Sequence, residues 1–498
     1  MDMAYYMLPE TSFIPFKAYR LKFASVIWVN IDLLHKYGLF LDKCEADDDI
    51  KRWLLEQFAY TTCISGGFVD SDDSSTFLAE RYGGQAISYN GGGARTGIKG
   101  KFQVKGIGPN LLVGEGSGYW YSHGGATLLE SVKEAMWGEV CNIILPHGSV
   151  RCLAVIETGI STTQDVSKEK IISPGGMVVR ENSLRVAHFE RAAFFRPQSQ
   201  YDISISDYDR TSSAVRTFPK IINALVKSEH FCMGDCLKQL ISRWADQVAY
   251  SKSVKLMHGA LTSSNLSLDG RWIDFGTTST LGAHTNVITA LGNPAFWSEH
   301  EPLCESIANL CFYVNKFLSE NTLNIGEMIC HFKYSYNLFM RRYFIALLGY
   351  PIRYIVSVEH HPAVERFFGL IIRMIQLGRM KIHTGISLYE QSSGIYNIHR
   401  LNKIIMEAKH PSNRMEEDFI SAFKEINDVI CKANEISLIE LEFIRTKELY
   451  KRVDNVDGLN VDIIHADISQ LISRGADVGV IDLYVNGKKQ LAKNMKVN

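Results

Sequence analysis

Two residues with the chemistry of metal ligands lie close together in the segment 256–276, LMHGALTSSNLSLDGRWIDFG. Asn265 belongs to a polar loop that begins with a histidine. Asp274 follows Trp272 and Ile273, which are typical of the buried end of a strand. An amide oxygen and a carboxylate are hard ligands suited to a small hard cation such as Mg²⁺ or Mn²⁺. Kinase-like enzymes hold Mg²⁺-ATP with such a pair. A strand followed by a turn, with no metal site, is also compatible with this sequence.

A lysine and a glutamate that would complete such a site lie upstream. Lys105 ends the alternating stretch KFQVK, which predicts a strand that stops at a glycine turn. Glu134 lies in 126–144, where apolar residues recur at helical spacing. A strand lysine paired with a helix glutamate fixes a cation against ATP phosphates in kinase-type sites. Glu130 and Glu139 compete with Glu134 on the same helix, and spacing alone does not choose between the three.

Composition restricts the classes of protein that this chain can belong to. The 498 residues, 46% of them hydrophobic, are enough for two or three domains with sizeable cores. The net charge of −1 gives no electrostatic case for binding nucleic acid or an anionic membrane. The N-terminus lacks the features of a secretion signal, and no apolar run reaches the ~20 residues of a membrane helix. Ten cysteines in mostly apolar contexts indicate reduced thiols, so we expect a cytoplasmic protein.

Several short motifs occur along roughly the first three fifths of the chain in the order of a known family. They are ASVIWVN at 24–30, YGGQ at 82–85, GGAR at 92–95, VKGIGP at 104–109, SVKEAM at 131–136, MVVRENSLRVAHFE at 177–190, the loop 258–276, and NPAFWSEHEPLCESIANL at 293–310. With these motifs the chain resembles the selenoprotein O family. The resemblance implies a kinase-like fold and transfer of AMP from ATP to protein side chains.

The resemblance also assigns roles to individual residues. It implies that Lys105 binds phosphate, that Glu134 rather than its two neighbours is the partner of this lysine, and that Asn265 and Asp274 hold the metal. The fold implied is α+β and bilobal, with a sheet in the N-lobe and a mostly helical C-lobe. The cofactors implied are ATP and Mg²⁺ or Mn²⁺.

The resemblance further implies an inverted nucleotide. Arg180 and Arg185 match two arginines that hold the γ-phosphate in the family, and Gly106 and Gly108 lie in the glycine turn expected beside the nucleotide. A planar guanidinium grips phosphate oxygens in pairs, which suits a triphosphate tail. A buried γ-phosphate leaves the α-phosphate facing the acceptor, so AMP is transferred and pyrophosphate leaves.

The chain departs from the family where the acceptor is expected. The family has an aspartate, proposed as general base, at the position of Ser264, and an asparagine at the position of Thr262. The segment after Lys105 is lengthened, and the C-terminal cysteine or selenocysteine of many members is missing. Ligands for nucleotide and metal are therefore kept, whereas groups that would face the acceptor have changed.

Three functions remain open on this reading. The first is transfer of AMP to a protein or peptide acceptor, and the others are a phosphotransferase and an inert nucleotide-binding scaffold for a partner enzyme. The chain also resembles accessory proteins of siderophore-microcin maturation. That likeness implies a peptide C-terminus activated as an acyl-adenylate and passed to a small acyltransferase-like partner.

The kinase pattern that the resemblance implies divides the chain into four parts: an N-terminal arm at 1–19, the N-lobe at 20–185, the C-lobe at 186–415 with the loop 256–276, and a C-terminal extension at 416–498, where the resemblance ends. Helices are expected at 47–60, 302–318, 334–348, 363–377, 416–433 and 438–453. The polar stretch 196–213 is expected to connect the lobes or to lie on the surface.

Three further features are given structural explanations. Cys232 and Cys236 lack a second pair of ligands at zinc spacing, and His360–Pro362 is typical of a helix start. LISRGADVGVID at 471–482 looks like half of an ankyrin repeat, which cannot bury its own face, and is interpreted as coincidence. The helices at 416–433 and 438–453 are expected to pack on the large lobe rather than to bind a partner.

Overall fold

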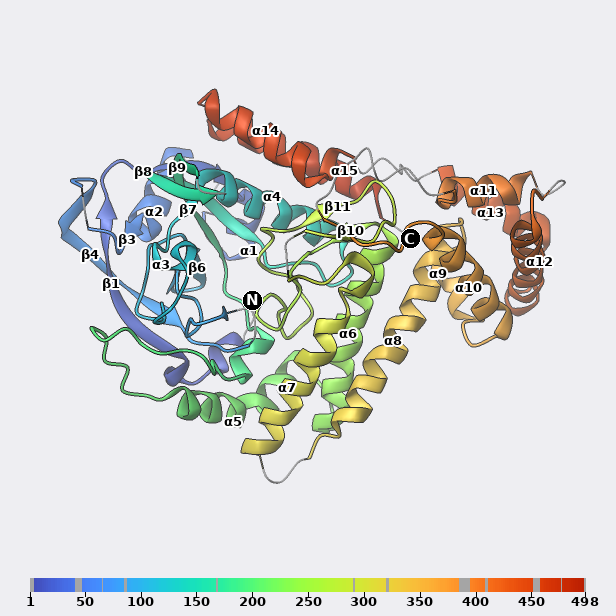
Figure 1. Ribbon diagram of the computed structural model, residues 1–498, viewed down its shortest axis with the longest axis horizontal. Coiled ribbons are helices and arrows are strands. Elements are labelled where there is room, and N and C mark those ends of the chain that lie inside the picture. The colour runs from blue at the N-terminus through green and yellow to red at the C-terminus, as the bar shows by residue number, and fades with distance from the viewer. Residues whose placement is uncertain are drawn as a thin grey trace.

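The computed structural model describes residues 4–40, 47–64, 66–84, 87–166, 169–289, 292–318, 322–384, 395–407, 411–450, 457–475 and 477–496. Within these ranges a nine-stranded sheet occupies the first part of the chain, and helices dominate the rest. Figure 1 shows the sheet on one side of the molecule and the long helices on the other. The α+β, kinase-like bilobal fold expected from the sequence is confirmed. Gln85, in one of the family motifs, lies outside the described residues.

The sheet is antiparallel at every pair of neighbouring strands described, and its order is β2-β8-β9-β6-β5-β4-β1-β3, with β7 paired to β9. The strands are β1 (Phe13–Leu21), β2 (Ser25–Val29), β3 (Tyr60–Thr61), β4 (Val69–Glu80), β5 (Thr96–Lys99), β6 (Phe102–Lys105), β7 (Ala126–Thr127), β8 (Cys152–Val166) and β9 (Glu169–Glu181). The sheet therefore already includes residues that the sequence places in the N-terminal arm.

Two longer helices accompany the sheet. α2 (Asp47–Phe58) follows the predicted span closely and buries Ile50, Leu54 and Phe58 in a cluster with the sheet. α4 (Leu128–Ile144) packs against β8 and β9. The shorter helices here are α1 (Ile31–Lys36) and α3 (Tyr119–Ser122).

The helical lobe is built around two long helices, α6 (Met233–Ser253) and α8 (Ile325–Ala346), which pack together. α8 begins nine positions before the predicted span because Asn324 accepts a hydrogen bond from Glu327 N at 3.1 Å and caps it there. The other helices are α5 (Asp207–Val226), α7 (Glu301–Phe317), α9 (Ile352–Val356) and α10 (Pro362–Gln376). α5 begins inside the polar stretch 196–213, with Ser206 as its cap.

The C-terminal extension crosses from one lobe to the other. α11 (Ile398–Met406), α12 (Arg414–Asn434) and α13 (Leu438–Tyr450) lie at the helical lobe, where α12 packs on α10 as expected. α14 (Val461–Ser473) and α15 (Val478–Asn494) instead pack on α4, and α15 also packs on β2. Figure 1 shows this helix pair, in red, lying over α4. The ankyrin-like segment is thus a helical hairpin that covers the helix of the candidate site.

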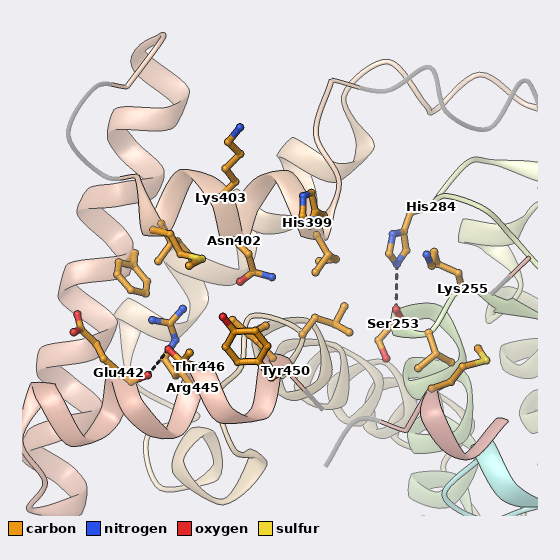
Figure 2. Close-up of a pocket in the computed structure, with 18 of the residues that line it drawn as sticks. Ser253, Lys255, His284, His399, Asn402, Lys403, Glu442, Arg445, Thr446 and Tyr450 are labelled. Carbon is orange, nitrogen blue, oxygen red and sulfur yellow. Dashed lines mark hydrogen bonds between the residues drawn. The ribbon is translucent and has the colours of Figure 1, made fainter. Parts of the chain in front are cut away.

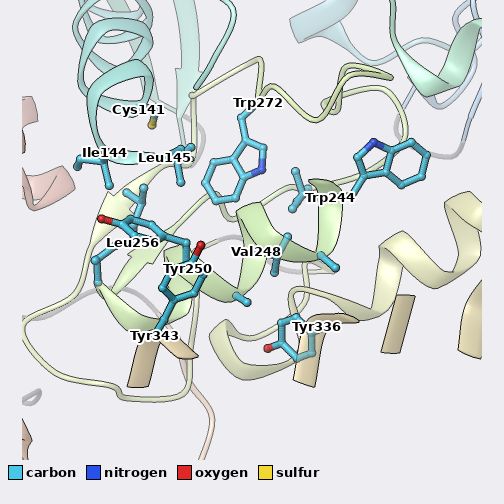
Figure 3. Close-up of a cluster of buried hydrophobic side chains, with 14 of the residues drawn as sticks. Cys141, Ile144, Leu145, Trp244, Val248, Tyr250, Leu256, Trp272, Tyr336 and Tyr343 are labelled. Atoms are coloured by element: carbon cyan, nitrogen blue, oxygen red, sulfur yellow. The ribbon is translucent and has the colours of Figure 1, made fainter. Parts of the chain in front are cut away.

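The two lobes share a hydrophobic core, part of which Figure 3 shows. The end of α4 meets α6 there, together with Trp272 and the short strand β10 (Leu256–Met257), which pairs with β11 (Ser279–Thr280). Trp272 forms isolated bridges to Ser149 and Leu266 rather than the expected strand. The turn at Gly270, with φ of +100°, and the left-handed Asp274 leave too few extended residues between them for a ladder.

Three smaller expectations fall within the described residues. His361 caps α10 by accepting a hydrogen bond from Ala363 N at 3.2 Å, as the helix-start interpretation requires. Cys232 and Cys236 are free thiols near the start of α6. A pair of short strands, β12 (Val287–Ile288) and β13 (His383–Thr384), completes the fold. In the described part of the chain, no helix combines the length and the apolar character that crossing a membrane requires.

Candidate active site

Lys105 is the last residue of β6, and the sheet fixes it from both sides. It lies opposite Thr96 on β5 and Val178 on β9. The side chain is only 10% exposed, and its Nζ donates a hydrogen bond of 3.0 Å to Glu134 Oε2. The same Nζ contacts a carboxylate oxygen of Asp274. The structure therefore brings together three residues that the sequence motifs single out.

The three glutamates of α4 have different partners. Glu130 forms a capping box with Thr127, in which Glu130 N donates to Thr127 Oγ1 at 3.1 Å and Thr127 N donates to Glu130 Oε2 at 2.9 Å. Glu139 forms an ion pair of 2.7 Å with Arg151 Nη2. Glu134 is the one of the three that contacts the strand lysine.

Arg180, on β9, is a second cation bound to Glu134. Its Nη1 contacts Glu134 Oε1, and its Nε donates to Gln103 Oε1 at 2.9 Å across the β6–β9 pair. Burial alone would lower the pKa of Arg180, but the Glu134 carboxylate and other nearby groups raise it above its usual value. Glu134 Oε2 also accepts a hydrogen bond of 3.3 Å from Phe275 N. One glutamate thus fixes two cations and the backbone that follows the metal-ligand candidate Asp274.

Asp274 has a left-handed backbone, with φ of +72°, which few residues other than glycine adopt. Its carboxylate is 32% exposed and contacts Lys105. Burial raises the pKa of Asp274, but Lys105, Arg180 and Arg95 lower it more, so the pKa lies well below its usual value. The carboxylate is therefore ionised at neutral pH, which is the state that binds a hard divalent cation.

The loop that ends at Asn265 is tied to the segment that leads to Asp274. His258 Nε2 lies 3.0 Å from Ile273 O, and burial lowers the pKa of this histidine, so its neutral ring donates to that carbonyl. Ile273 N in turn donates to Asn265 O at 3.1 Å. Asn265 Nδ2 donates to Ala260 O at 2.8 Å, and within the described residues its Oδ1 forms no hydrogen bond. The acceptor oxygen of the amide is therefore available to a cation.

A metal held by Asn265 and Asp274 would need ligands from outside the protein. Among the residues that the structure describes, no three or more His, Cys, Asp or Glu side chains form a metal-binding group. One amide oxygen and one ionised carboxylate fit a Mg²⁺ ion whose shell is completed by phosphate oxygens and water. The donor set thus fits a metal that arrives with a nucleotide.

Arg185 differs from Arg180 because no carboxylate of the described residues forms a direct ion pair with it. The buried Glu80 interacts with it only at longer range, where Arg185 helps to lower the pKa of that carboxyl. The Arg185 side chain is buried, its Nη1 donates to Ser264 O, and its guanidinium lies over the Tyr82 ring, 4.9 Å from the centroid. Its Nε has no hydrogen-bond partner, and no carboxylate of the described residues lies within ion-pair distance of this guanidinium. Burying a charge without a direct ion-pair partner is unfavourable, so this cation is suited to an anionic ligand.

The remaining candidates lie at the edges of the site. Ser264 is buried, and its hydroxyl lies 3.1 Å from Thr262 Oγ1. Gly106 and Gly108 have φ of +96° and +102°. A Cβ on Gly106 would lie 2.7 Å from Gly176 O, and one on Gly108 would lie 2.3 Å from a threonine hydroxyl oxygen. Close packing of the turn after β6 is therefore sufficient to require glycine at both positions, without a role in nucleotide binding.

Two charged residues near the site have no assigned role in the sequence reading. Arg95, from the GGAR motif, is close enough to Asp274 to lower its pKa. Glu190, from the motif at 177–190, is buried; burial raises its pKa to about 7, and its Oε1 has no hydrogen-bond partner among the described residues. Membership of a motif was the only sequence signal for either residue, because neither the burial of a side chain nor its distance from the site can be read from the amino-acid sequence.

The fold and the paired lysine and glutamate define a kinase-like protein. Residues 4–290, more than half of the chain, match the family model described as protein adenylyltransferase SelO. The chain therefore belongs to the SelO family, as the motifs predict.

Three relatives carry the name protein nucleotidyltransferase YdiU. The Clostridium perfringens protein is 30% identical over 198 residues, which are 36% of this chain and 37% of that protein. The Xanthomonas euvesicatoria protein is 27% identical over 200 residues, covering 39% and 35%. The Lachnoclostridium phytofermentans protein is 23% identical over 348 residues, covering 65% and 63%. The matched regions thus span less than two thirds of each of these relatives.

Proposed function

We propose that this chain binds Mg²⁺-ATP between its lobes and transfers AMP to a protein or peptide acceptor. Lys105 and Arg180, both held by Glu134, would contact the phosphates, and Asn265 and Asp274 would hold the cation. The names of the family and of its relatives support nucleotide transfer. Mg²⁺ supplies positive charge between phosphates; the positions of the cationic side chains come from the protein.

The observation that carries this proposal is the buried guanidinium of Arg185, which has no direct ion pair with a carboxylate of the described residues. Arg185 and Arg180 lie in the same segment of the chain. Two arginines in this segment would suit the end of a triphosphate tail, because each guanidinium can bind phosphate oxygens in pairs. With the γ-phosphate bound there, the α-phosphate faces the acceptor. The acceptor oxygen then forms a bond to the α-phosphorus, the bond between that phosphorus and the bridging oxygen breaks, and pyrophosphate leaves.

We further propose that the acceptor is a carboxylate, because Ser264 stands where the family has its proposed base. A hydroxyl acceptor must lose a proton during attack, and a serine hydroxyl cannot take that proton at neutral pH. A carboxylate with a pKa of about 4 is already ionised and needs no base. The product would be an acyl-adenylate.

An acyl-adenylate is consumed when another nucleophile attacks its carbonyl carbon, the bond from that carbon to the phosphate oxygen breaks, and AMP leaves. We therefore propose that a peptide C-terminus is activated and passed to a small acyltransferase-like partner in the cytoplasm, as in siderophore-microcin maturation.

Labelled ATP tests the reaction directly. The full chain is incubated with Mg²⁺, a candidate acceptor and ATP labelled at either the α- or the γ-phosphate. Acceptor labelled from the α-position supports AMP transfer, and acceptor labelled from the γ-position makes the chain a phosphotransferase. Nucleotide binding without label transfer would favour an inert scaffold, for which the loss of the base at Ser264 is the motivating observation.

A further inference from the structure

A cavity of about 1000 Å³ lies between the helical lobe and the C-terminal extension. Figure 2 shows its two sides: Ser253, Lys255 and His284 on one, and residues of α11 and α13 on the other. The end of α15 also contributes to its wall. None of the residues assigned above to nucleotide or metal lines this cavity. It is therefore a second cavity, separate from the candidate active site.

Arg445, on α13, is the distinctive polar group of this cavity. It is 6% exposed, and its Nε and Nη2 both donate to Leu348 O, at 3.2 and 3.1 Å. Its guanidinium also lies over the rings of Tyr350 and Phe423, 4.7 and 4.6 Å from their centroids. A carbonyl and two aromatic rings thus hold the planar group in one orientation, which is the preorganised state for binding a planar anion.

No carboxylate of the described residues forms an ion pair with Arg445. Glu442, one helical turn earlier, contributes favourable charge but lies beyond ion-pair distance, and burial lowers the pKa of Arg445 below its usual value. Nη1 forms no hydrogen bond within the described part of the chain. A buried guanidinium with one unused edge, in the wall of a cavity, is the kind of group that an anionic ligand satisfies.

Besides Arg445 the lining carries two lysines and two glutamates whose formal charges cancel: Lys255, Lys403, Glu407 and Glu442. The other lining residues are apolar or uncharged. Met406 and Tyr450 are among the most exposed large side chains of the chain, and both line this cavity. Burial lowers the pKa of His284 to about 3, so its ring is neutral and adds no positive charge. The cavity therefore offers a fixed cation beside apolar surface, at a volume near the upper end of ordinary ligand pockets, about 300–1,000 Å³.

We propose that this cavity binds an organic carboxylate with an apolar body, with the carboxylate on Arg445 and the apolar part against Met406 and Tyr450. A peptide C-terminus and a free small acid share this chemistry. The site needs neither ATP nor the proposed AMP transfer, so binding there can be measured without either.

Calorimetric titration of the full chain with four probes tests the proposal. The probes are N-acetylphenylalanine, its amide, a tripeptide with a free C-terminal phenylalanine, and octanoate. We expect the free acids to bind with Kd near or below about 1 mM and the amide to bind at least about tenfold more weakly. Tighter binding of the tripeptide than of octanoate identifies a peptide terminus as the ligand, and the reverse order identifies a free acid.

Two variants tie the binding to this cavity. Arg445→Met should raise the Kd of the free acids by about tenfold or more. Arg366→Met removes an exposed arginine of α10 that lies outside the cavity, and it should leave the Kd of the free acids unchanged. If Arg445→Met does not fold, Thr446→Trp fills the cavity from an exposed position and should have the same effect. The proposal is overturned if no acid binds, if acid and amide bind equally, or if a folded cavity variant binds like the wild type.

Discussion

Lys105 and Asp274 are in direct contact, although they lie 169 positions apart and belong to the sheet and to the helical lobe. Lys105 therefore contacts two carboxylates, those of Glu134 and Asp274. The proposed metal would compete with the lysine for Asp274. Binding of Mg²⁺-ATP would then exchange the lysine–aspartate contact for lysine–phosphate and aspartate–metal contacts, and this exchange couples the two lobes through the ligand.

The first prediction concerns the metal. Asp274→Ala should remove the Mg²⁺ dependence of ATP binding and weaken binding in Mg²⁺ by about tenfold or more, because one of two protein ligands is lost. Calorimetric titration with ATP, in Mg²⁺ and in chelator, measures both effects. Asp269→Ala is the control, since Asp269 pairs with Arg271 outside the site. ATP binding by the wild type that is equally tight in chelator would contradict the assignment.

The second prediction concerns Glu134, which orients both Lys105 and Arg180. Glu134→Gln should lower the rate of AMP transfer more than Lys105→Met, because it releases two cations instead of one. The double variant should lose little beyond Glu134→Gln, with a coupling of about 1–3 kcal/mol. A double-mutant cycle on kcat/KM measures this coupling. Glu130→Gln and Glu139→Gln are matched controls on α4, and fully additive losses would refute the pairing.

The sequence predicts the strand of Lys105 and the helix of Glu134 because both have clear periodicity. It cannot choose among Glu130, Glu134 and Glu139, since all three belong to one helix and their partners come from elsewhere in the chain. The family resemblance supplied that choice. Arg185 illustrates the same limit, because its lack of a direct ion pair depends on burial and on every neighbouring segment.

The C-terminal hairpin was the least predictable element. The segment 471–482 was interpreted as a coincidental likeness, and only tertiary structure shows that α14 and α15 lie against α4. Their apolar residues carry no information about which face elsewhere in the chain covers them. Trp272 was expected in a strand for a similar reason: its apolar neighbours fit one, whereas the turns on both sides limit it to isolated bridges.

The third prediction concerns pH. The pKa of Glu190 is raised from 4.5 to about 7 by burial, so folding favours its neutral form. There is no penalty below about pH 4.5; it grows as the pH rises from 4.5 to 7 and levels off above pH 7 at about 3 kcal/mol. Glu190→Gln should therefore stabilise the protein at pH 8 and change little at pH 4.5. Chemical unfolding at both pH values measures the difference.

Glu80 is the matched control for this experiment. It is also buried, but Tyr5 Oη and Gln103 Nε2 each donate to it at 2.8 Å, and its pKa is lowered because His188 and Arg185 outweigh the effect of burial. Glu80→Gln should therefore destabilise at pH 8, the opposite sign to Glu190→Gln. Equal effects of the two substitutions at pH 8 would show that the environment of Glu190 is not as described.

The fourth prediction concerns the hairpin over α4. Ile481 is buried on α15, whereas Leu483, two positions later, is 74% exposed. Ile481→Ala should lower the free energy of unfolding by about 2–5 kcal/mol and speed hydrogen exchange in α4, and Leu483→Ala should do neither. Exchange measured by mass spectrometry separates the two. Unchanged protection of α4 in Ile481→Ala would mean that the hairpin does not support this helix.

The fifth prediction concerns the acceptor and rests on Ser264. A peptide with a free C-terminal carboxylate should accept AMP and, in hydroxylamine, should be recovered as the hydroxamate, whereas the amidated peptide should accept none. Ser264→Ala should change this transfer little, because an ionised carboxylate needs no base. Ser264→Asp restores a carboxylate at the position of the family's proposed base. It should add transfer to Ser, Thr or Tyr hydroxyls, with a gain of about 10²–10⁴-fold. Transfer by the wild type that survives amidation and resists hydroxylamine would identify a hydroxyl acceptor and refute the carboxylate.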